Sequence, residues 1–372
     1  MTTPAHDGRF GIPHLRPPGL ELRAPFEDRH EPRIPNWFTP WDGDSPLDVG
    51  VVMAGLSTTS ILPTSCYSAP NAFRLSHPQF TTYTPDYDVD IQSLRVRDLG
   101  DISVPILDPI QGLGNIQECL LGIHQLPQRP FVVVIGGDHA VTAPSFRAFC
   151  QANPDLRAGL IHFDAHNDVR VMDHGPTNGT PVRQILESGF NVSGRNLVQV
   201  GIHGFMNANY YKRWVEHQGG TIYTGRQVRR QGIDSVVREA YEIAGDGADA
   251  IYVTVDIDVL ELGYVAGTGA ATPEGLHPTD LCEALFFLGQ QPKVAIVDFV
   301  EHDPVRDVAA ITGRTLTSAF LTFLAGLFLR LKDGWRGYED TPLDEELELA
   351  DRKLVGQAGG SLWRWRGSGW RN

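Results

Sequence analysis

From Leu47 onward, short apolar runs alternate with longer segments in which apolar residues recur at helical spacing. Several of the short runs are apolar at consecutive positions, as strands that are buried on both faces of a sheet require. The predicted strands are residues 48–53, 131–135, 158–163, 197–201, 221–224, 250–255 and 294–300. The predicted helices are residues 142–153, 180–188, 233–244, 279–289 and 315–331. This alternation predicts an α/β fold of three layers, helix–sheet–helix, around a largely parallel central sheet.

Residues 1–46 have a different pattern, with many prolines and no apolar periodicity. Because proline removes a hydrogen-bond donor and blocks helices, we predict an extended arm here. Its aromatic residues Phe26, Trp37, Phe38 and Trp41 suggest that it packs on a surface, such as a neighbouring subunit, although a loosely packed tail fits equally. The chain then divides into an arm, 1–46, a folded domain, 47–335, and a tail, 336–372, whose role the sequence does not indicate.

Composition narrows the class of protein. The chain has 372 residues, of which 41% are hydrophobic and 20% charged, as is typical of a globular protein with a sizeable core. Its 45 acidic and 31 basic side chains give a net charge of −14. A surface this negative repels phosphate backbones and anionic lipids, so we expect neither nucleic acid nor a membrane as a partner.

Three features predict a cytoplasmic location. The first residues contain no apolar signal core. The longest apolar run, residues 319–331, is too short to span a bilayer. The cysteines form no CxxC pair, which suits a reducing compartment; they are Cys66, Cys119, Cys150 and Cys282.

Polar residues follow four of the predicted strands, at the strand ends where ligands bind in open α/β sheets. The segments are Gly136-Gly-Asp-His139, Asp164-Ala-His-Asn-Asp168, Asp256-Ile-Asp258 and the single Glu301. In an extended segment, residues at i, i+2 and i+4 project to the same face. The side chains of Asp164, His166 and Asp168 can therefore converge, as can those of Asp256 and Asp258.

Imidazoles combined with several carboxylates are ligands for divalent ions such as Mn²⁺, Ni²⁺ or Co²⁺. Four ionised aspartates carry a charge of −4 that two divalent ions would cancel, whereas unpaired buried carboxylates are very costly. A lone Asp-x-Asp is usually a cap or a turn, and a lone histidine at a strand end is usually a core residue. Together they predict a two-metal hydrolytic site, with ligands His139, Asp164, His166, Asp168, Asp256 and Asp258.

The first three of these segments resemble the signature blocks of the ureohydrolases, the family of arginase, agmatinase and their relatives. The resemblance continues through Ala266-Gly-Thr-Gly269 and Val300-Glu-His-Asp-Pro304 and covers about residues 48–331. It implies an arginase-like fold, and it makes residues 47–335 the catalytic domain. It also implies a homo-oligomer, either a trimer or a hexamer.

The resemblance implies a role for each ligand: His139 and Asp168 as terminal ligands of one metal, His166 and Asp258 of the other, and Asp164 and Asp256 as bridges. The implied metal is Mn²⁺, with Ni²⁺ as the alternative. Glu301 stands where the family places an acid that hydrogen-bonds the nitrogens of an amidine or guanidine. The competing interpretation is a strand-end acid paired with Arg306 or Arg314.

Within the family, three segments resemble formimidoylglutamases more than arginases or agmatinases: Leu56–Ile61, Asp98–Ile102, and Asp168–Arg170 with Gly175–Arg183. Arginases and agmatinases have a proton-transferring histidine where this chain has Asn178. An amide does not carry protons, so either Asp168 alone handles the proton or His174 or His203 takes over. The first loop, Thr64–Pro70, and Leu260-Glu261 also depart from the family pattern, which weakens the substrate assignment.

The leading hypothesis is hydrolysis of N-formimidoyl-L-glutamate to L-glutamate and formamide. Asp168 would move the proton, Glu301 would bind the amidine, Asn178 would line the substrate site, and Arg170 and Arg183 would clamp the carboxylates. Each arginine is equally well explained as a surface or helix-cap residue. One alternative is hydrolysis of guanidine, a biguanide or a guanidino acid with release of urea or a urea derivative. The other is an inactive partner subunit of a hetero-oligomer, which the six filled ligand positions argue against.

Overall fold

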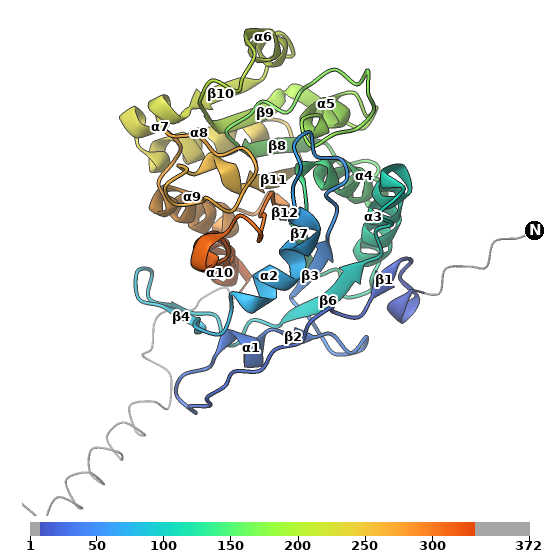
Figure 1. The fold of residues 1–372 in the computed structure, drawn as a ribbon, viewed down its shortest axis with the longest axis vertical. Helices are drawn as coiled ribbons and strands as arrows, with labels where there is room; N and C mark the ends of the chain where they lie inside the picture. The colour runs from blue at the N-terminus through green and yellow to red at the C-terminus, as the bar shows by residue number, and fades with distance from the viewer. Residues whose placement is uncertain (1–7, 332–372) are drawn as a thin grey trace, which may run out of the picture. The chain divides into compact units, whose positions relative to one another are not determined.

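The computed structural model describes residues 8–331, so the predicted tail at 336–372 lies outside the described residues. Its centre is a ten-stranded sheet in which every pairing is parallel except that of β1 with β6 (Figure 1). The strand order is β1 (Leu15–Arg16), β6 (Val96–Ile102), β3 (Val49–Ala54), β7 (Phe131–Gly136), β12 (Val294–Val300), β11 (Ala250–Asp256), β8 (Ala158–Phe163), β9 (Val192–Ile202) and β10 (Thr221–Thr224), and β2 (Thr39–Pro40) also pairs with β6. The predicted largely parallel sheet is confirmed.

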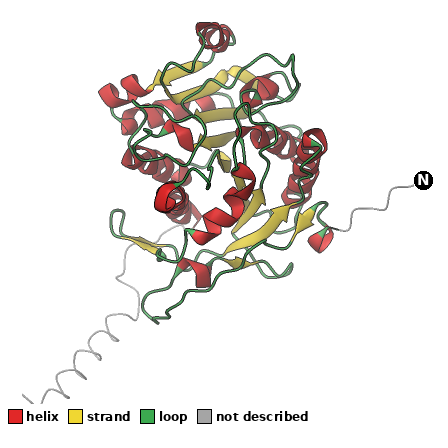
Figure 2. Cartoon of the chain, in the orientation of Figure 1, coloured by secondary structure: helices red, strands yellow, loops and turns green. Residues whose placement is uncertain are grey.

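Helices cover the sheet in two groups, as Figure 2 shows. One group packs together as α3 (Pro109–His124), α4 (Thr142–Ala152) and α5 (Pro181–Leu186). The other group packs together as α2 (Ala69–Leu75), α7 (Gly225–Gln231), α8 (Ile233–Gly245), α9 (Pro278–Gln290) and α10 (Ile311–Leu331). Outside these layers are α1 (Ile34–Trp37), α6 (Asn209–His217) and a two-stranded ribbon of β4 (Tyr83–Thr84) and β5 (Val89–Asp90). The predicted helix–sheet–helix architecture is confirmed.

All seven predicted strands and all five predicted helices are present; β8, β10 and β12 have the predicted bounds, and the ends of the others are shifted. Consecutive apolar residues do mark doubly buried strands, since every residue of β3, β7, β8 and β11 is buried. The sequence analysis missed β6, because Arg97, Asp98 and Asp101 interrupt its apolar pattern. It also missed α3, in which three glycines lower helix propensity.

The arm lies against its own chain over residues 8–46. β1 and β2 both pair with β6, so they cover an edge that would otherwise expose unpaired backbone groups. Ile34 and Trp41 are completely or almost completely buried, and the Trp41 amide donates to the Asp98 carbonyl (2.9 Å). A loosely packed tail therefore does not describe these residues, while contact between the arm and a neighbouring subunit stays a prediction.

One described helix, Val308–Leu331, is long and apolar enough to cross a membrane by length and composition alone, with a mean hydropathy of 1.4. It is longer than the apolar run recognised in the sequence. Half of its most apolar window is buried inside the fold, where α10 packs along α9. The two backbones approach closely, because a Cβ at Gly326 would lie 2.2 Å from the Phe286 carbonyl oxygen. Packing in a protein core accounts for this composition.

A buried ion pair joins α2 to β6. The Arg74 guanidinium donates to Asp98 (2.7 Å) and to Asp101 (2.6 Å), and the side chains of Arg74 and Asp98 are 3% and 5% exposed. Removing one partner of a buried pair leaves the other charge uncompensated.

We therefore expect Arg74→Met to lower the free energy of unfolding by about 3–5 kcal/mol. The matched control is Arg157→Met, which breaks an exposed pair with Asp249 and should cost less than about 1 kcal/mol. Urea unfolding of both variants measures the difference. Equal losses of unfolding free energy in Arg74→Met and Arg157→Met would mean that burial does not increase the contribution of the Arg74 ion pair to stability.

Candidate metal centre

The predicted ligands meet at one edge of the sheet because the strands that carry them are neighbours. β7, β12, β11 and β8 lie side by side and run parallel, so their carboxyl ends open on the same side. The loops that follow them bring all six predicted ligands and Glu301 to this edge.

His139 is the centre of a first cluster. It sits in a 3-10 turn directly after β7 and is completely buried. Its Nδ1 atom lies 3.1 Å from a carboxylate oxygen of each of Asp164, Asp168 and Asp256. One imidazole nitrogen and three carboxylates thus surround a single point, as the ligands of one cation do.

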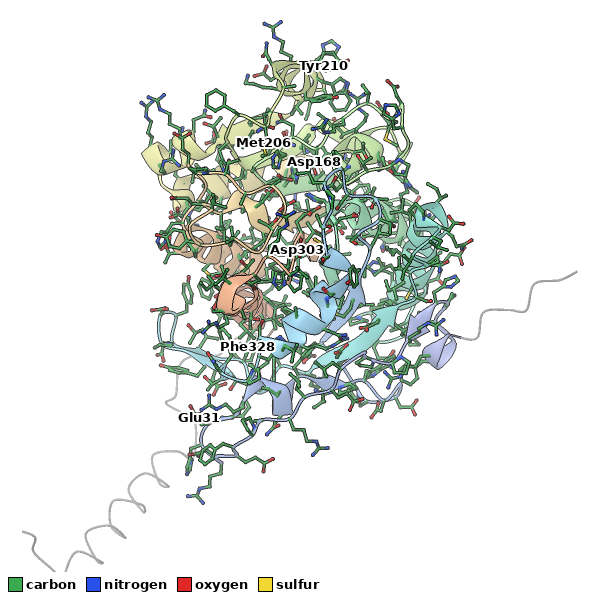
Figure 3. All side chains as sticks on the ribbon, viewed as in Figure 1. Glu31, Asp168, Met206, Tyr210, Asp303 and Phe328 are labelled. Atoms are coloured by element: carbon green, nitrogen blue, oxygen red, sulfur yellow. The ribbon has the colours of Figure 1, made fainter. Side chains whose placement is uncertain are left out.

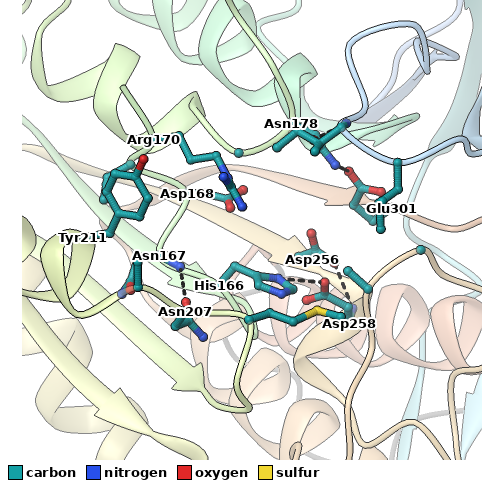
Figure 4. A pocket seen from close by; sticks show the side chains of 18 of the residues that line it. His166, Asn167, Asp168, Arg170, Asn178, Asn207, Tyr211, Asp256, Asp258 and Glu301 are labelled. Atoms are coloured by element: carbon teal, nitrogen blue, oxygen red, sulfur yellow. Dashed lines mark hydrogen bonds and ion pairs between the residues drawn. The ribbon is translucent and has the colours of Figure 1, made fainter. Parts of the chain in front are cut away.

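His166 forms a second cluster on the other side of Asp164. Its Nδ1 atom lies 3.3 Å from Asp164 Oδ1. The same atom lies 3.1 Å from Asp258 Oδ2, and Figure 4 shows these two side chains next to each other. Asp256 connects the clusters as well, since its Oδ1 accepts a hydrogen bond from the Asp258 amide (2.8 Å) while its Oδ2 faces His139. Asp164 and Asp256 therefore lie where the sequence analysis expected bridging ligands.

The electrostatics of this site fit cations. Burial, followed by the charges of Asp258 and Asp164, raises the pKa of Asp256 well above its usual range. Burial alone would lower the pKa of His139, but Asp164, Asp168 and Asp256 outweigh it and raise that pKa well above its usual range. Without a metal, the negative charge of the four carboxylates is therefore offset by protons on Asp256 and His139. A divalent cation in each cluster would neutralise it with a suitable set of nitrogen and oxygen ligands.

Two residues of the site have strained backbones. Asp168 and Glu301 adopt φ values of 50° and 67°, in the left-handed region that side chains other than glycine rarely occupy. Each is fixed by the chain around it: the Asp168 carbonyl accepts from the Val182 amide (3.1 Å), and the Glu301 amide donates to the Gly137 carbonyl (2.8 Å). Such strain costs about 1–3 kcal/mol per residue and clusters at functional sites.

Glu301 is buried and held from two sides. Its Oε1 accepts hydrogen bonds from the His139 amide (2.8 Å) and the Asn178 side chain (3.0 Å). Burial, followed by the charge of Asp138, raises the pKa of Glu301 to about 8. A cationic ligand beside it would favour the ionised form.

The competing interpretation of Glu301 is wrong. The Arg306 side chain pairs with Asp303 (3.1 Å) and donates to the Pro63 carbonyl. The Arg314 side chain donates to backbone carbonyls at the start of α10. Within residues 8–331, neither arginine therefore forms an ion pair with Glu301.

A cavity of about 320 Å³ opens over the two clusters. Figure 4 shows Arg170 and Tyr211 at one end and Glu301 at the other, and the Arg170 guanidinium lies 6.0 Å from the centre of the Tyr211 ring. The ligands His166, Asp168, Asp256 and Asp258 and the neighbouring Asn178 line the same cavity. Among the described residues Arg170 has no ion-pair partner, so its charge is available to a ligand.

Arg183 does not line this cavity. Its guanidinium donates to the Val169 carbonyl (2.9 Å) and to Glu187 (3.0 Å), and it stacks over the Trp214 ring at 4.1 Å. These contacts attach α5 to its surroundings. The prediction that Arg183 clamps a substrate carboxylate is therefore wrong.

The two histidines considered as proton carriers also lie elsewhere. His203 is held between the carbonyls of Gly201 (2.7 Å) and Thr272 (3.3 Å), and His174 is exposed on a loop. Neither lines the cavity. Asp168 does line it and is the proton-transfer candidate that remains.

Two buried residues that support the candidate ligands, Asp138 and His162, were not predicted from the sequence. Asp138 accepts hydrogen bonds from the Thr59 hydroxyl (2.7 Å) and the Ala140 amide (3.1 Å), so it ties the segment Leu56–Ile61 to the turn of His139. His162 Nε2 lies 2.7 Å from Asp164 Oδ2 and orients that carboxylate.

The signal for both was in the sequence. Asp138 directly precedes a ligand, and His162 is the one polar residue in an otherwise apolar strand. A buried charged or titratable group needs a partner, and here the partners are Thr59 for Asp138 and the candidate ligand Asp164 for His162.

Asp303 is a further carboxylate in this part of the molecule, and Figure 3 labels it together with Asp168 and Met206. Met206 lines the cavity and is half exposed, whereas Asp303 is buried. The Asp303 carboxylate accepts from the Ser65 amide (3.1 Å) and so joins the loop after β12 to the first loop. The divergent first loop is thus anchored to the strand end that carries Glu301.

Comparisons with known proteins agree with this geometry. The family model described as "Arginase family" matches residues 47–325. A formimidoylglutamase from Halalkalibacterium halodurans is 36% identical, over 82% of this chain and 95% of its own length. The crystal structure of formimidoylglutamase from Bacillus subtilis has a TM-score of 0.78 at 29% identity and covers 83% of this chain and 96% of that one.

A further structure similar in fold is a formiminoglutamase from Trypanosoma cruzi with Mn²⁺, with a TM-score of 0.71 at 23% identity over 81% of this chain and 99% of that one. The expected arginase-like fold and the resemblance to the ureohydrolases are thereby confirmed. With a family model that spans most of its length and a relative this similar over most of both chains, the protein belongs to the arginase family.

Proposed function

We propose that this protein hydrolyses N-formimidoyl-L-glutamate to L-glutamate and formamide. The observation that carries the proposal is the placement of Arg170 opposite Glu301 across one cavity, with the candidate metal ligands between them. A substrate with a carboxylate at one end and an amidine at the other matches this order of charges. The 36% identity to a formimidoylglutamase supports the same substrate.

The candidate site would hold two divalent cations. His139 and Asp168 would bind one and His166 and Asp258 the other, with Asp164 and Asp256 shared. Mn²⁺ is the first candidate, because the similar Trypanosoma cruzi structure contains it, and Ni²⁺ is the alternative that the ligand types permit. Two such ions, when bound, supply Lewis acidity and a water molecule of lowered pKa.

The chain's own residues would then direct the reaction. Glu301 would accept hydrogen bonds from the amidine nitrogens, and Asn178 would hold its carboxylate in place. Asp168 would take a proton from the attacking water and deliver it to the departing nitrogen of glutamate. Its strained backbone fixes the direction of that carboxylate.

Arg170 would bind a substrate carboxylate through its planar fork of N–H donors. The same charge would repel guanidine or a biguanide, both of which are cations without a carboxylate. A guanidino acid does carry a carboxylate, and a guanidinopropionase from Pseudomonas aeruginosa is 33% identical over 62% of this chain and 72% of its own length. Hydrolysis of a guanidino acid to urea is therefore the second candidate. The inactive-subunit hypothesis has little support, because all six candidate ligands are present and clustered.

We further propose a cytoplasmic homo-oligomer. The four cysteines are free, as they are in a reducing compartment. Three exposed apolar side chains lie just before α3 (Ile106 and Leu107) and in its first turn (Ile110), and they are of the kind that subunit contacts cover.

Chelation should remove activity, and Mn²⁺ or Ni²⁺ should restore it. Purified protein should contain close to two divalent ions per chain, and Asp256→Asn should lower both metal content and turnover, because it removes one negative charge from between the clusters. Metal analysis and the rate of formamide release measure the two effects. Asp246→Asn, on the exposed surface, is the control. Unchanged metal content and turnover in Asp256→Asn would contradict the two-metal site.

Arg170→Met should weaken binding of formimidoylglutamate, mainly through KM, because a charge-assisted contact is lost. We expect kcat/KM to fall roughly tenfold to a hundredfold. Arg213→Met, on the exposed side of α6, should leave it unchanged. Assays with formimidoylglutamate, guanidino acids, guanidine and agmatine identify the substrate. Faster turnover of guanidine or agmatine than of either acid would overturn the proposed role of Arg170.

Glu301→Gln should lower kcat/KM by roughly ten- to a hundredfold on any amidine or guanidine substrate, since the neutral amide binds a cationic nitrogen centre less strongly. Steady-state kinetics measure the loss, and Glu283→Gln, a residue of α9 far from the cavity lining, is the control. A silent Glu301→Gln would show that the amidine does not bind against this strand end.

A further inference from the structure

Behind His139, a network of buried polar groups faces the nitrogen that the carboxylates do not contact. His139 Nε2 lies 2.9 Å from the Thr254 hydroxyl. Thr254 on β11 is directly opposite Asp298 on β12 in the parallel register. Both residues are completely buried, and neither is among the six candidate ligands.

Asp298 is surrounded by hydroxyl groups. Its Oδ2 accepts hydrogen bonds from the Tyr252 hydroxyl (2.7 Å) and the Thr142 hydroxyl (2.8 Å). Burial raises the pKa of this carboxyl, while the charge of His139 and the hydroxyls of Thr254, Tyr252 and Thr142 oppose the rise. Its Oδ1 is buried and lacks a hydrogen bond of ordinary geometry. A buried carboxylate oxygen in this position attracts the nearby Thr254 hydroxyl hydrogen.

The direction of the hydrogen bonds follows from the chemistry of these groups. A carboxylate only accepts, so the Thr142 hydroxyl donates to Asp298 (2.8 Å). The Thr254 oxygen lies 3.4 Å from the Thr142 oxygen, so the Thr254 hydroxyl donates in turn towards Thr142 and Asp298. The Thr254 oxygen is then left as an acceptor and takes a hydrogen bond from His139 Nε2–H. With its proton on Nε2, the neutral ring has its lone pair on Nδ1, the atom that faces Asp164 and Asp168.

Without the carboxylate this order is no longer enforced. The Thr254 hydroxyl would be free to donate to Nε2, and the ring proton would then sit on Nδ1. That tautomer presents a hydrogen to the first cluster and does not bind a cation there. Partners that fix a ligand histidine in this way commonly change metal affinity tenfold to a hundredfold.

We propose that Asp298, acting through the Thr254 hydroxyl, is a positioning residue that holds His139 in the tautomer able to bind metal. The proposal rests on the proposed two-metal function and adds to it a residue outside the cavity. It concerns one cluster alone, since the network reaches His139 and not His166.

The test measures metal affinity and not turnover. Metal-free wild type, Asp298→Asn, Thr254→Val, Thr254→Ser and Tyr252→Phe are titrated with Mn²⁺ against a chelating indicator. Asp298→Asn and Thr254→Val should weaken one of the two sites by about ten- to a hundredfold and leave the other nearly unchanged. Thr254→Ser keeps the hydroxyl, and Tyr252→Phe removes only a side hydrogen bond to Asp298. The Mn²⁺ affinities of Thr254→Ser and Tyr252→Phe should both stay within about threefold of the wild-type affinity.

Thermal unfolding of the metal-free proteins separates positioning from structure. A merely structural role would lower the unfolding midpoint and leave the Mn²⁺ affinity of the folded protein intact. Wild-type affinity at both sites in folded Asp298→Asn, or equal weakening in Thr254→Ser and Thr254→Val, would overturn the proposal. If Asp298→Asn does not fold, the comparison of Thr254→Val with Thr254→Ser is sufficient to confirm or overturn the proposal. A wild type that binds no Mn²⁺ would instead refute the proposed function.

Discussion

The side chains of Asp164, Asp168, Asp256 and Asp258 bring four carboxylates to one edge of the sheet, where none is more than 10% exposed. Burying this much negative charge is strongly unfavourable unless cations accompany it. The sheet makes the concentration possible, because four neighbouring parallel strands release their chains at the same edge. The fold therefore stabilises an arrangement whose charge must be balanced, either by protons on Asp256 and His139 or by bound cations that replace those protons.

The positions of three arginines are consistent with a site that binds cations. Arg74 is used in a buried pair beneath α2, and Arg183 is used to attach α5. Arg170 is the one guanidinium that lines the described cavity, and it stands at the end opposite Glu301. Among the described residues, no arginine forms an ion pair with the carboxylates of the two clusters, and Arg170 has no ion-pair partner. The proposed binding of metal and of a substrate carboxylate requires both conditions. Separation of charge along the cavity thus distinguishes the two ends of a ligand.

The sequence predicted the central strands and the meeting of the six candidate ligands at one edge of the sheet, because both follow local rules. Doubly buried strands are apolar at consecutive positions, and ligands follow such strands at i, i+2 and i+4. β6 could not be recognised, because Asp98 is buried only through its pairing with Arg74, 24 residues earlier. The failure of Arg183 has the same cause: its partners Val169 and Trp214 come from other elements. Contacts between segments distant in sequence decide whether a charged side chain is structural or functional, and spacing does not reveal them.

Asn178, which stands where arginases and agmatinases have a histidine, connects the segment Leu56–Ile61 to Glu301. The Asn178 side chain accepts a hydrogen bond from the Ile61 amide (3.0 Å) and donates one to Glu301 (3.0 Å). An amide keeps both abilities at every pH, whereas a histidine loses its acceptor when it is protonated. A proton-carrying histidine here would release the Ile61 amide each time it became charged. The Asn178 amide instead holds Ile61 and Glu301 in a constant relation. In the proposed reaction the proton is then carried by Asp168, whose own backbone is already fixed by α5.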